Sequence, residues 1–323
     1  MDFYLIGIDY QRANIELREE LYRKRKDIYS LLSRYFQDSA MISTCNRIEI
    51  YGLGNDPGTL SRGLSGWYLI KGKAKVFRHA LRLAAGLESQ LRGEKEILKQ
   101  LGTWRAALPQ SLSNVWKRAY FDALDLRGQS GLDKEHDNIS TFLYRDIERL
   151  GLKDKILKVI VVGTGKIAEL LAKNSPKNID LYFVSHKNKL RALELADYSQ
   201  GNVLGFEALA AYLQEADILI SATVSPHYII TKDKIQSALL NRDNPLYIYD
   251  LGFPRGIEPQ AEEINGVVLK NLDDFSPDFE KYNKTIREKL NLAEYLVEER
   301  VKVYEESVEA GESAEPVSLA SGR

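Results

Sequence analysis

The sequence predicts an α/β protein with an α+β first domain, a second domain built on a doubly wound parallel sheet, and a long C-terminal helix. Three observations support this class: mixed strand and helix patterns up to residue 145, alternating apolar strands and helices over 146–274, and a helical apolar stripe after residue 275. We therefore predict domains at 1–145 and 146–274, a helix over 275–310, and a disordered tail over 311–323.

The composition is that of an ordinary globular protein. Of its 323 residues, 44% are hydrophobic and 28% charged, enough for about two domain cores. One cysteine is too few for an internal disulfide, and the histidines lack metal-site spacing, so we predict no metal and a reducing, cytoplasmic setting. We find neither a run of about 18 apolar residues nor a signal peptide, and we expect no membrane association.

Charge is unevenly distributed along the chain. Residues 1–145 hold 23 Lys+Arg and 17 Asp+Glu, a net +6, whereas the remainder holds 22 and 29, a net −7. Because Lys and Arg neutralise phosphates, the positive half favours a nucleic-acid partner. A solvated helix face is the alternative interpretation of basic runs such as Arg23–Lys26 and Lys71–Lys75.

Strand and helix signals also alternate through the first domain. They predict a strand at Phe3–Tyr10, a helix at Glu16–Phe36, a strand with a polar interruption at Ala40–Gly52, a turn at 52–66, and a helical region from about Ala74 to about Leu126 that breaks near Leu108-Pro109. The polar interruption, Ser43–Arg47, contains the only cysteine, Cys45. Without further context, such a cysteine is most often a small buried hydrophobic residue.

The second domain is predicted from apolar strands that alternate with helices. Five strands are expected, at Ile156–Val162, Ile179–Val184, near Val203, at Ile218–Ser221 and at Leu246–Leu251. This alternation is typical of a parallel, Rossmann-like sheet.

A glycine-containing turn directly follows the first of these strands. Gly163-Thr164-Gly165-Lys166-Ile167-Ala168 has the GxGxxA pattern that places a pyrophosphate at a helix N-terminus, although a tight turn without a nucleotide is the alternative. After the next strand, Ser185-His186-Lys187 stands where an NAD site has an acidic residue. A cationic, hydroxyl-bearing turn suits a 2′-phosphate, so we predict NADPH rather than NADH.

The C-terminal segment is predicted to be one helix of nearly thirty residues, about 45 Å long. Ser276 is the expected N-cap and Pro277 the first helical residue. Apolar residues recur every three or four positions at Phe279, Tyr282, Ile286, Leu290, Ala293, Val297, Val301 and Tyr304. This stripe must be buried against the other domains or against a second copy of the chain.

A cysteine in a basic domain beside a reducing cofactor indicates acyl chemistry. A thiolate attacks an activated carbonyl to give a thioester, and hydride transfer to that thioester gives an aldehyde. An acyl group esterified to RNA is already activated, and its carrier would account for the positive charge. The residues thus favour reduction of an acyl group.

Three ordered motifs resemble those of the glutamyl-tRNA reductase family. Ser43-Thr-Cys-Asn-Arg-Ile-Glu-Ile-Tyr51 is similar to the family's STCNRxEIY signature. His79–Ser89 with Gly93–Gln100 resembles its HLxxVAxGLDS and GEPQILGQ segments, and Asp217–Thr223 with Tyr249–Pro259 resembles DIVISST and DxxxPRxIDP.

The resemblance implies a function and a set of site residues. It implies NADPH-dependent reduction of glutamyl-tRNA(Glu) to glutamate-1-semialdehyde, the first step of tetrapyrrole (5-aminolevulinate, porphyrin and haem) biosynthesis, with Cys45 as nucleophile and His79 as a proton relay. It assigns the glutamyl group to Thr44, Asn46, Arg47, Ser89, Glu94, Lys95, Glu96 and Gln100, and NADPH to 163–168. Arg47 suits a substrate carboxylate and favours the Cys45 thiolate. Glu94 and Glu96 suit the α-ammonium group. Glutamate-1-semialdehyde aminomutase is a further suggested partner.

The chain also departs from the family pattern. Tyr10–Asn14 replaces HKTAP, Lys95-Glu96 replaces Pro-Gln, and no dimerisation domain follows the long helix, so we expect a monomer or a dimer through the helix stripe. Two alternative functions remain: a non-catalytic relative that binds tRNA or a pathway partner, and a reductase of another acyl donor, which Glu96 would favour. Arg18 is either a family site residue or a helix salt-bridge partner.

Overall fold

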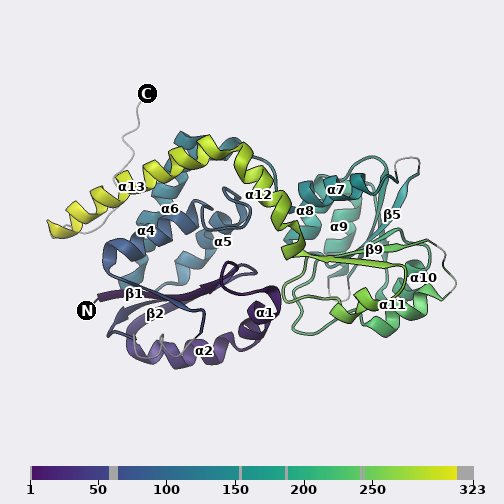
Figure 1. Cartoon of the computed structure of the whole chain (residues 1–323), viewed down its shortest axis with the longest axis horizontal. Coiled ribbons are helices and arrows are strands. Elements are labelled where there is room, and N and C mark those ends of the chain that lie inside the picture. The colour runs from purple at the N-terminus through teal and green to yellow at the C-terminus, as the bar shows by residue number, and fades with distance from the viewer. Residues whose placement is uncertain are drawn as a thin grey trace. The chain divides into compact units, whose positions relative to one another are not determined.

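The computed structural model describes residues 2–57, 65–152, 155–185, 188–240, 242 and 244–310. The chain forms two compact units (Figure 1): unit 1 comprises Met1–His136 and Asp278–Arg323, and unit 2 comprises Asp137–Pro277. The first boundary lies before helix α7 (Ile139–Arg149) rather than near residue 145. Asp146 explains this difference, because its carboxylate accepts hydrogen bonds from Tyr249 (2.8 Å) and Lys270 (2.7 Å) of unit 2.

Unit 1 is built on an antiparallel sheet with the strand order β2-β3-β1-β4. The strands are β1 (Asp2–Asp9), β2 (Phe36–Ser43), β3 (Arg47–Gly54) and β4 (Tyr68–Lys71). The predicted strand over 40–52 is therefore a hairpin of two strands, and its polar interruption is the turn between them. Strand β4 was not predicted, because it is only four residues long and directly precedes a helix.

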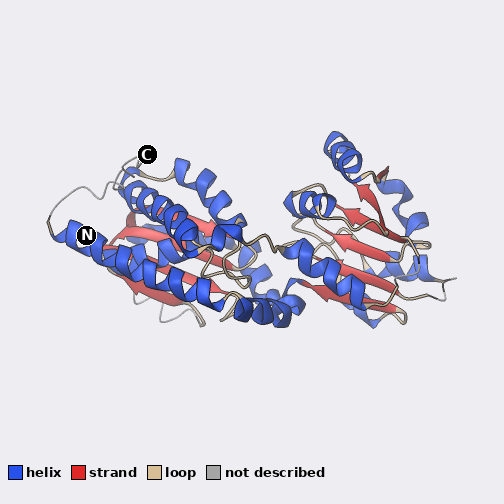
Figure 2. Ribbon diagram, turned by 90° about the horizontal axis from the view of Figure 1, so that it is seen from above, coloured by secondary structure: helices blue, strands red, loops and turns tan. Residues whose placement is uncertain are grey.

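Helices cover both faces of this sheet (Figure 2). One face is covered by α1 (Ile15–Arg23) and α2 (Arg25–Leu32), and the other by α4 (Lys73–Ala84), α5 (Glu96–Trp104) and α6 (Gln110–Ser130). Successive strand residues alternate between the two faces: Leu5 packs with the second set of helices, whereas Tyr4 and Ile6 pack beneath α2.

Two predicted helices of unit 1 are broken in the structure. The helix predicted over 16–36 is divided at Lys24 between α1 and α2 and ends at Leu32, before a short 3-10 turn. The predicted break near Leu108-Pro109 is present, but residues 85–95 form a second, unpredicted break between α4 and α5. Gly86, two residues after the end of α4, has a left-handed φ of 81°, and Gly93 before α5 has a left-handed φ of 79°.

The C-terminal stripe is buried within unit 1. It lies on α12 (Ser276–Thr285) and α13 (Arg287–Glu309), which Ile286 separates with φ −99° and ψ 17°. Tyr304 stacks on Phe77 of α4 at 3.9 Å between ring centroids. The prediction of one unbroken helix was wrong, as was the N-cap: Ser276 is already helical, and Asn271 caps the 3-10 turn that precedes it.

Unit 2 contains a parallel sheet with the order β10-β9-β8-β5-β6-β7. The strands are β5 (Leu157–Val162), β6 (Ile179–Val184), β7 (Asn202–Leu204), β8 (Ile218–Ser221), β9 (Leu246–Asp250) and β10 (Val267–Asn271); the helices besides α7 are α8 (Lys166–Lys173), α9 (Lys189–Ser199), α10 (Leu209–Leu213) and α11 (Lys232–Leu239). This order matches the doubly wound dinucleotide-binding fold, in which ligands bind where β5 meets β8. The α/β fold class is confirmed, and β10 alone was not predicted.

Candidate functional site

Cys45 lies in the hairpin turn between β2 and β3 and is partly exposed. The turn is closed by the Thr44 N–H, which donates to the Arg47 carbonyl oxygen at 2.9 Å. Arg18 of α1 donates from Nε to the Cys45 carbonyl oxygen and from Nη1 to Ala13, both at 2.9 Å. The buried Arg18 guanidinium thus fixes the backbone that carries the thiol.

Beside this turn, Glu49 forms the centre of a buried polar cluster. Its carboxylate accepts hydrogen bonds from Arg47 (2.7 Å), Tyr51 (2.6 Å) and Tyr68 (2.7 Å), and it lies 2.9 Å from Nε2 of His79. Three of these residues come from β3 and one from β4, while His79 projects from α4. Strand alternation brings the three β3 residues together, because residues 47, 49 and 51 share one face of the sheet.

The pKa values explain how this cluster tolerates burial. Burial alone would raise the pKa of Glu49, but the charges of His79 and Arg47 outweigh it and hold this pKa well below its ordinary value. Burial and the Glu49 charge both raise the pKa values of Tyr51 and Tyr68. Both phenols therefore stay protonated and donate to an ionised Glu49.

Arg47 is committed to partners within the protein. It is 2% exposed, and besides Glu49 it donates to the backbone carbonyl of Glu88. A substrate carboxylate would have to use the remaining N–H groups of this guanidinium. His79 is likewise buried.

The segment between α4 and α5 carries several predicted site residues and is fixed by residues from elsewhere. Arg127 of α6, which is fully buried, donates to the carbonyl oxygens of Ala85 (2.7 Å), Gly93 (3.0 Å) and Glu94 (3.1 Å). Asn283 of α12 accepts from the Arg92 N–H at 3.1 Å and donates to Gln90 at 2.9 Å. Neither Arg127 nor Asn283 was predicted to contribute, because nothing in the local sequence marks an interaction across 33 or more residues.

Within this segment Glu94 acts as a helix cap. Its carboxylate accepts from the N–H groups of Glu96 (2.6 Å) and Ile97 (3.2 Å) and from the Ser89 hydroxyl (3.1 Å). Burial raises the pKa of Glu94, although these hydrogen bonds oppose the rise. The carboxylate thus has internal donors, and it is less available to an α-ammonium group than the sequence suggested.

The other predicted substrate residues lie at the surface end of α5 or in the turn. Lys95 donates to the backbone carbonyl of Asp133, and Glu96 forms an ion pair with Lys99 at 2.9 Å. Gln100 is exposed on α5. Thr44 and Asn46 flank Cys45 and are partly exposed. Of the predicted substrate residues, only Thr44 and Asn46 are adjacent to Cys45 in the chain.

In unit 2 the predicted glycine turn joins β5 to α8 at the carboxyl edge of the sheet. Gly163 has a φ of 115°, and a Cβ atom there would lie 2.4 Å from the Ala222 carbonyl oxygen. A Cβ on Gly165 would meet only one atom within 4 Å, so backbone N–H groups at the start of α8 are accessible. Ala168 is buried in the helix.

Two further features bear on whether a dinucleotide fits this edge. The Oγ1 atom of Thr223, just after β8, is buried without a hydrogen-bond partner in the described structure. The methyl group of Thr223 would lie 3.1 Å from a Cβ atom on Gly163, and its Oγ1 atom would lie 2.8 Å from a Cβ atom on Gly256. An open phosphate turn beside an unsatisfied hydroxyl fits a nicotinamide dinucleotide. Ser185 directly follows β6, whereas His186 and Lys187 lie outside the described residues.

Asp250 at the end of β9 is a buried residue that the sequence analysis did not single out. It accepts from the N–H groups of Ile257 (2.7 Å) and Gly252 (3.2 Å). Burial raises the pKa of Asp250 to about 6 despite these bonds. It fixes the loop after β9 at the same edge of the sheet.

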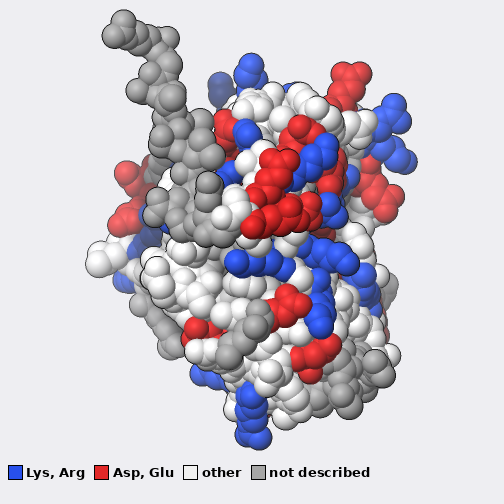
Figure 3. All heavy atoms as spheres, turned by 90° about the vertical axis from the view of Figure 1, so that its left-hand side faces the viewer, with Lys and Arg blue, Asp and Glu red and all other residues white. Residues whose placement is uncertain are grey.

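Surface charge is mixed on the face shown in Figure 3. Lys and Arg side chains alternate there with Asp and Glu, and no broad area of one sign is visible. Much of the positive charge of the first 145 residues is paired, as in the ion pair of Arg78 with Glu298 (2.7 Å). The described helices also include none that is long and apolar enough to cross a membrane.

Comparison with known proteins finds the same family that the three motifs resemble. Residues 6–114 match the family described as glutamyl-tRNAGlu reductase, N-terminal domain, and residues 148–277 match shikimate / quinate 5-dehydrogenase. The glutamyl-tRNA reductase of Sulfurihydrogenibium sp. (strain YO3AOP1) is 28% identical, with 94% of this chain and 75% of the relative covered. That of Archaeoglobus fulgidus is 29% identical, with 94% and 72% covered. The structure of glutamyl-tRNA reductase from Methanopyrus kandleri matches with a TM-score of 0.50 and 27% identity, over 96% of this chain and 81% of that one.

The chain is similar to glutamyl-tRNA reductases over nearly its whole length. The resemblance predicted from the three motifs is thus confirmed. In this chain the first matched segment contains the Cys45 turn and the Glu49 cluster, and the second contains the Gly163–Ala168 turn. Glu49 and Arg127 help to build the candidate site, although the motif comparison assigned neither of them to it.

Proposed function

We propose that the protein is an NADPH-dependent glutamyl-tRNA reductase that forms glutamate-1-semialdehyde through a thioester on Cys45. The observation that carries the proposal is the placement of the only cysteine: a partly exposed thiol in a tight turn, whose backbone is held by Arg18 and which directly precedes the buried Arg47–Glu49–His79 cluster. A cysteine that served only as a core residue would not need this fixed, exposed turn.

The first proposed step is acyl transfer. The Cys45 sulfur attacks the ester carbonyl carbon that joins the glutamyl group to the tRNA ribose, the carbon–oxygen bond breaks, and the ribose oxygen takes a proton. His79 is the proposed proton relay, and Glu49 fixes its ring through the 2.9 Å contact at Nε2. The positive charges of Arg18 and Arg47 near the turn favour the thiolate.

The second proposed step is reduction. When bound, NADPH would supply a hydride to the carbonyl carbon of the thioester; the carbon–sulfur bond would then break, and the Cys45 sulfur would leave as the thiolate. The Gly163–Ala168 turn, with Ser185 and Thr223, is the proposed cofactor site, together with His186 and Lys187. NADPH is preferred to NADH because Ser185 occupies the position at the end of β6 where an acidic residue would bind a ribose 2′-hydroxyl.

For the glutamyl group, we propose contacts with Thr44, Asn46 and the free N–H groups of Arg47, with Ser89, Glu94, Lys95, Glu96 and Gln100 as further candidates. Glu96 is the better candidate for the α-ammonium group, because Glu94 already accepts three internal hydrogen bonds. The aldehyde would enter tetrapyrrole biosynthesis through glutamate-1-semialdehyde aminomutase, the proposed partner.

The test is to incubate the purified protein with glutamyl-tRNA(Glu) and NADPH and to measure glutamate-1-semialdehyde. We expect product with the wild type and none with Cys45→Ser. No product from the wild type, or full activity of Cys45→Ser, contradicts the proposal. Tight tRNA binding without turnover would instead support a non-catalytic relative.

A reductase of another acyl donor is the second candidate, favoured by the Lys95-Glu96 pair that replaces Pro-Gln. Competition among aminoacyl-tRNAs distinguishes the two: we expect glutamyl-tRNA to be preferred in the wild type. If the wild type instead prefers a different aminoacyl-tRNA, and Glu96→Gln shifts that preference to glutamyl-tRNA, the protein is a reductase of the other donor.

A further inference from the structure

A cluster of one cation and two aromatic rings lies where α5 ends and α6 passes. Arg105 begins the short 3-10 turn η2 (Arg105–Ala107), and its guanidinium carbon lies 4.4 Å from the ring centroid of Tyr120 and 5.3 Å from that of Phe121. The two rings meet edge to face at 5.6 Å. Phe121 is 40% exposed, so its ring is accessible beside the cation.

Arg105 differs from the other arginines of this part of the chain. The five others between α4 and the end of α6 each contact a carboxylate: Arg78, Arg82, Arg92, Arg118 and Arg127. Among the residues that the structure describes, Arg105 has no acidic partner, and its buried Nε atom has no hydrogen-bond acceptor. Its charge is therefore available to an anionic ligand.

The accessible surface continues along α6. Lys117, Phe121 and Leu124 are spaced by four and three residues on the exposed side of the helix, and Leu124 is 39% exposed. The acidic residues of this helix point elsewhere, since Asp122 pairs with Arg118 and Asp125 with Arg300. We call Arg105, Lys117, Tyr120, Phe121 and Leu124 the Arg105 patch.

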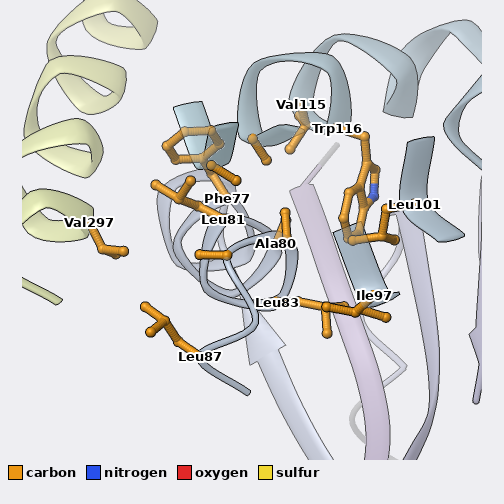
Figure 4. Close-up of a cluster of buried hydrophobic side chains, with 14 of the residues drawn as sticks. Phe77, Ala80, Leu81, Leu83, Leu87, Ile97, Leu101, Val115, Trp116 and Val297 are labelled. Carbon is orange, nitrogen blue, oxygen red and sulfur yellow. The ribbon is translucent and has the colours of Figure 1, made fainter. Parts of the chain in front are cut away.

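The base of the patch is rigid. Trp116 of α6 and Leu101 of α5 lie side by side in the core beneath it (Figure 4). Trp104, the residue before Arg105, packs edge to face on Trp116 at 4.9 Å and donates its indole N–H to the Met41 carbonyl oxygen at 3.0 Å. Met41 lies on β2, four residues before Cys45, so the patch is attached to the strand that leads into the Cys45 turn.

We propose that the Arg105 patch binds the single-stranded end of the RNA that carries the acyl group. The proposal rests on the proposed function. An exposed aromatic ring provides a stacking surface for a base, and unpaired Arg and Lys side chains contact phosphates. The glutamyl group would then lie toward the other end of α5, a nine-residue helix about 13 Å long that begins at Glu96. The unpaired positive charges favour RNA over a protein partner, which would require only the apolar part of the patch.

The test measures binding of deacylated tRNA, and of a short RNA ending in CCA, to the full-length protein by fluorescence anisotropy. We expect Phe121→Ala and Arg105→Ala each to weaken binding about tenfold. Arg105→Ala should also lower the slope of log K against log salt by about 0.7, the loss of one phosphate contact. Tyr35→Ala and Arg34→Ala are matched controls, because these residues are exposed in η1 (Ser33–Tyr35), outside the patch, and should bind RNA as the wild type does.

Single-turnover thioester formation separates this proposal from the proposed function. At saturating glutamyl-tRNA we expect Phe121→Ala to react at the wild-type rate, with only the half-saturating concentration raised. If the wild type forms no thioester, the proposed function fails, whereas the RNA-binding result still tests the patch. If all patch variants bind both RNAs with wild-type affinity, the patch proposal is overturned and the surface belongs to a protein partner.

Discussion

Each unit contains a fully buried carboxylate beside its candidate site, and the two have opposite electrostatic surroundings. Glu49 in unit 1 is contacted by Arg47, His79 and two phenols, which lower its pKa. Asp250 in unit 2 accepts backbone N–H groups, and its burial raises its pKa to about 6. Neutral dipoles thus compensate burial less completely than charged partners do.

The difference matches what each unit has to hold in place. In unit 1 the candidate site is formed by side chains from several strands and helices, so ionic contacts fix their geometry. In unit 2 the candidate site is a backbone turn at the edge of a parallel sheet, so glycine conformation and loop anchoring fix it. Changes to charge should therefore damage unit 1 most, and changes to the backbone should damage unit 2 most.

The largest effect is expected from Glu49→Gln. The substitution leaves the Arg47 guanidinium buried without its charged partner, and we expect it to lower the free energy of unfolding by about 3–5 kcal/mol. Glu298→Gln is the control: it removes the exposed partner of Arg78 and should cost less than about 1 kcal/mol. Denaturant unfolding of both variants measures the difference in the free energy of unfolding. Equal losses would show that the buried Glu49 cluster stabilises the fold no more than an exposed ion pair does.

Asp250 should make the free energy of unfolding depend on pH with the opposite sign to Glu49, because burial raises the pKa of Asp250 whereas the pKa of Glu49 is lowered. Because its pKa of about 6 in the folded protein lies above its ordinary 3.8, its contribution to stability is complete below pH 3.8 and is lost as the pH rises through 6. We expect Asp250→Asn to remove about 2 kcal/mol of the difference in unfolding free energy between about pH 4 and pH 7. Asp233→Asn, at an exposed position, should leave the pH profile unchanged. A profile that Asp250→Asn does not alter would rule out this titration.

Gly163→Ala should affect cofactor binding alone. The side chain would be placed at a φ of 115° and 2.4 Å from the Ala222 carbonyl oxygen, so the turn must shift. We expect the KM for NADPH to rise about tenfold, with thioester formation in the absence of NADPH unchanged. Gly128→Ala, at an open helical position in α6, should change neither quantity. Parallel loss of both activities in Gly163→Ala would contradict the separation of the two sites.

The smallest effect is expected from Arg18→Lys. Lysine keeps the charge but cannot donate to both the Cys45 and Ala13 carbonyl oxygens in the same geometry. We expect Cys45 to react with iodoacetamide about threefold more slowly, the value of one weakened hydrogen bond. Arg23→Lys, on the exposed side of α1, should react at the wild-type rate. Faster alkylation of Arg18→Lys would mean that Arg18 shields the thiol instead of positioning its turn.

Features that depend on local sequence were predictable. The Gly163–Ala168 turn follows from glycines next to an apolar strand, and the five predicted strands of unit 2 follow from continuous apolar runs. Residues 85–95 were not predictable in the same way, because their apolar spacing continues that of a helix. Their conformation depends on Arg127 and Asn283, which lie 33 or more positions away in the chain.

The sequence predicted which residues belong to the candidate site, but it did not predict the contacts between them. The motif placed Cys45 and Arg47 together, yet it could not show that Arg47 donates to Glu49 or that Glu94 caps α5. Strand alternation alone puts 47 and 49 on one face, but which helix covers that face is decided by packing across the whole unit. Such contacts require the tertiary structure.

Formation of a thioester on Cys45 is tested most directly by trapping the acyl group on the protein. Wild-type protein is mixed with labelled glutamyl-tRNA(Glu) in the absence of NADPH, quenched with acid, and digested for mass spectrometry. We expect one glutamyl group per chain, on the peptide that contains Cys45, and its release as aldehyde when NADPH is supplied before the quench. Label on another residue, or an equal amount of label on Cys45→Ser, would contradict it.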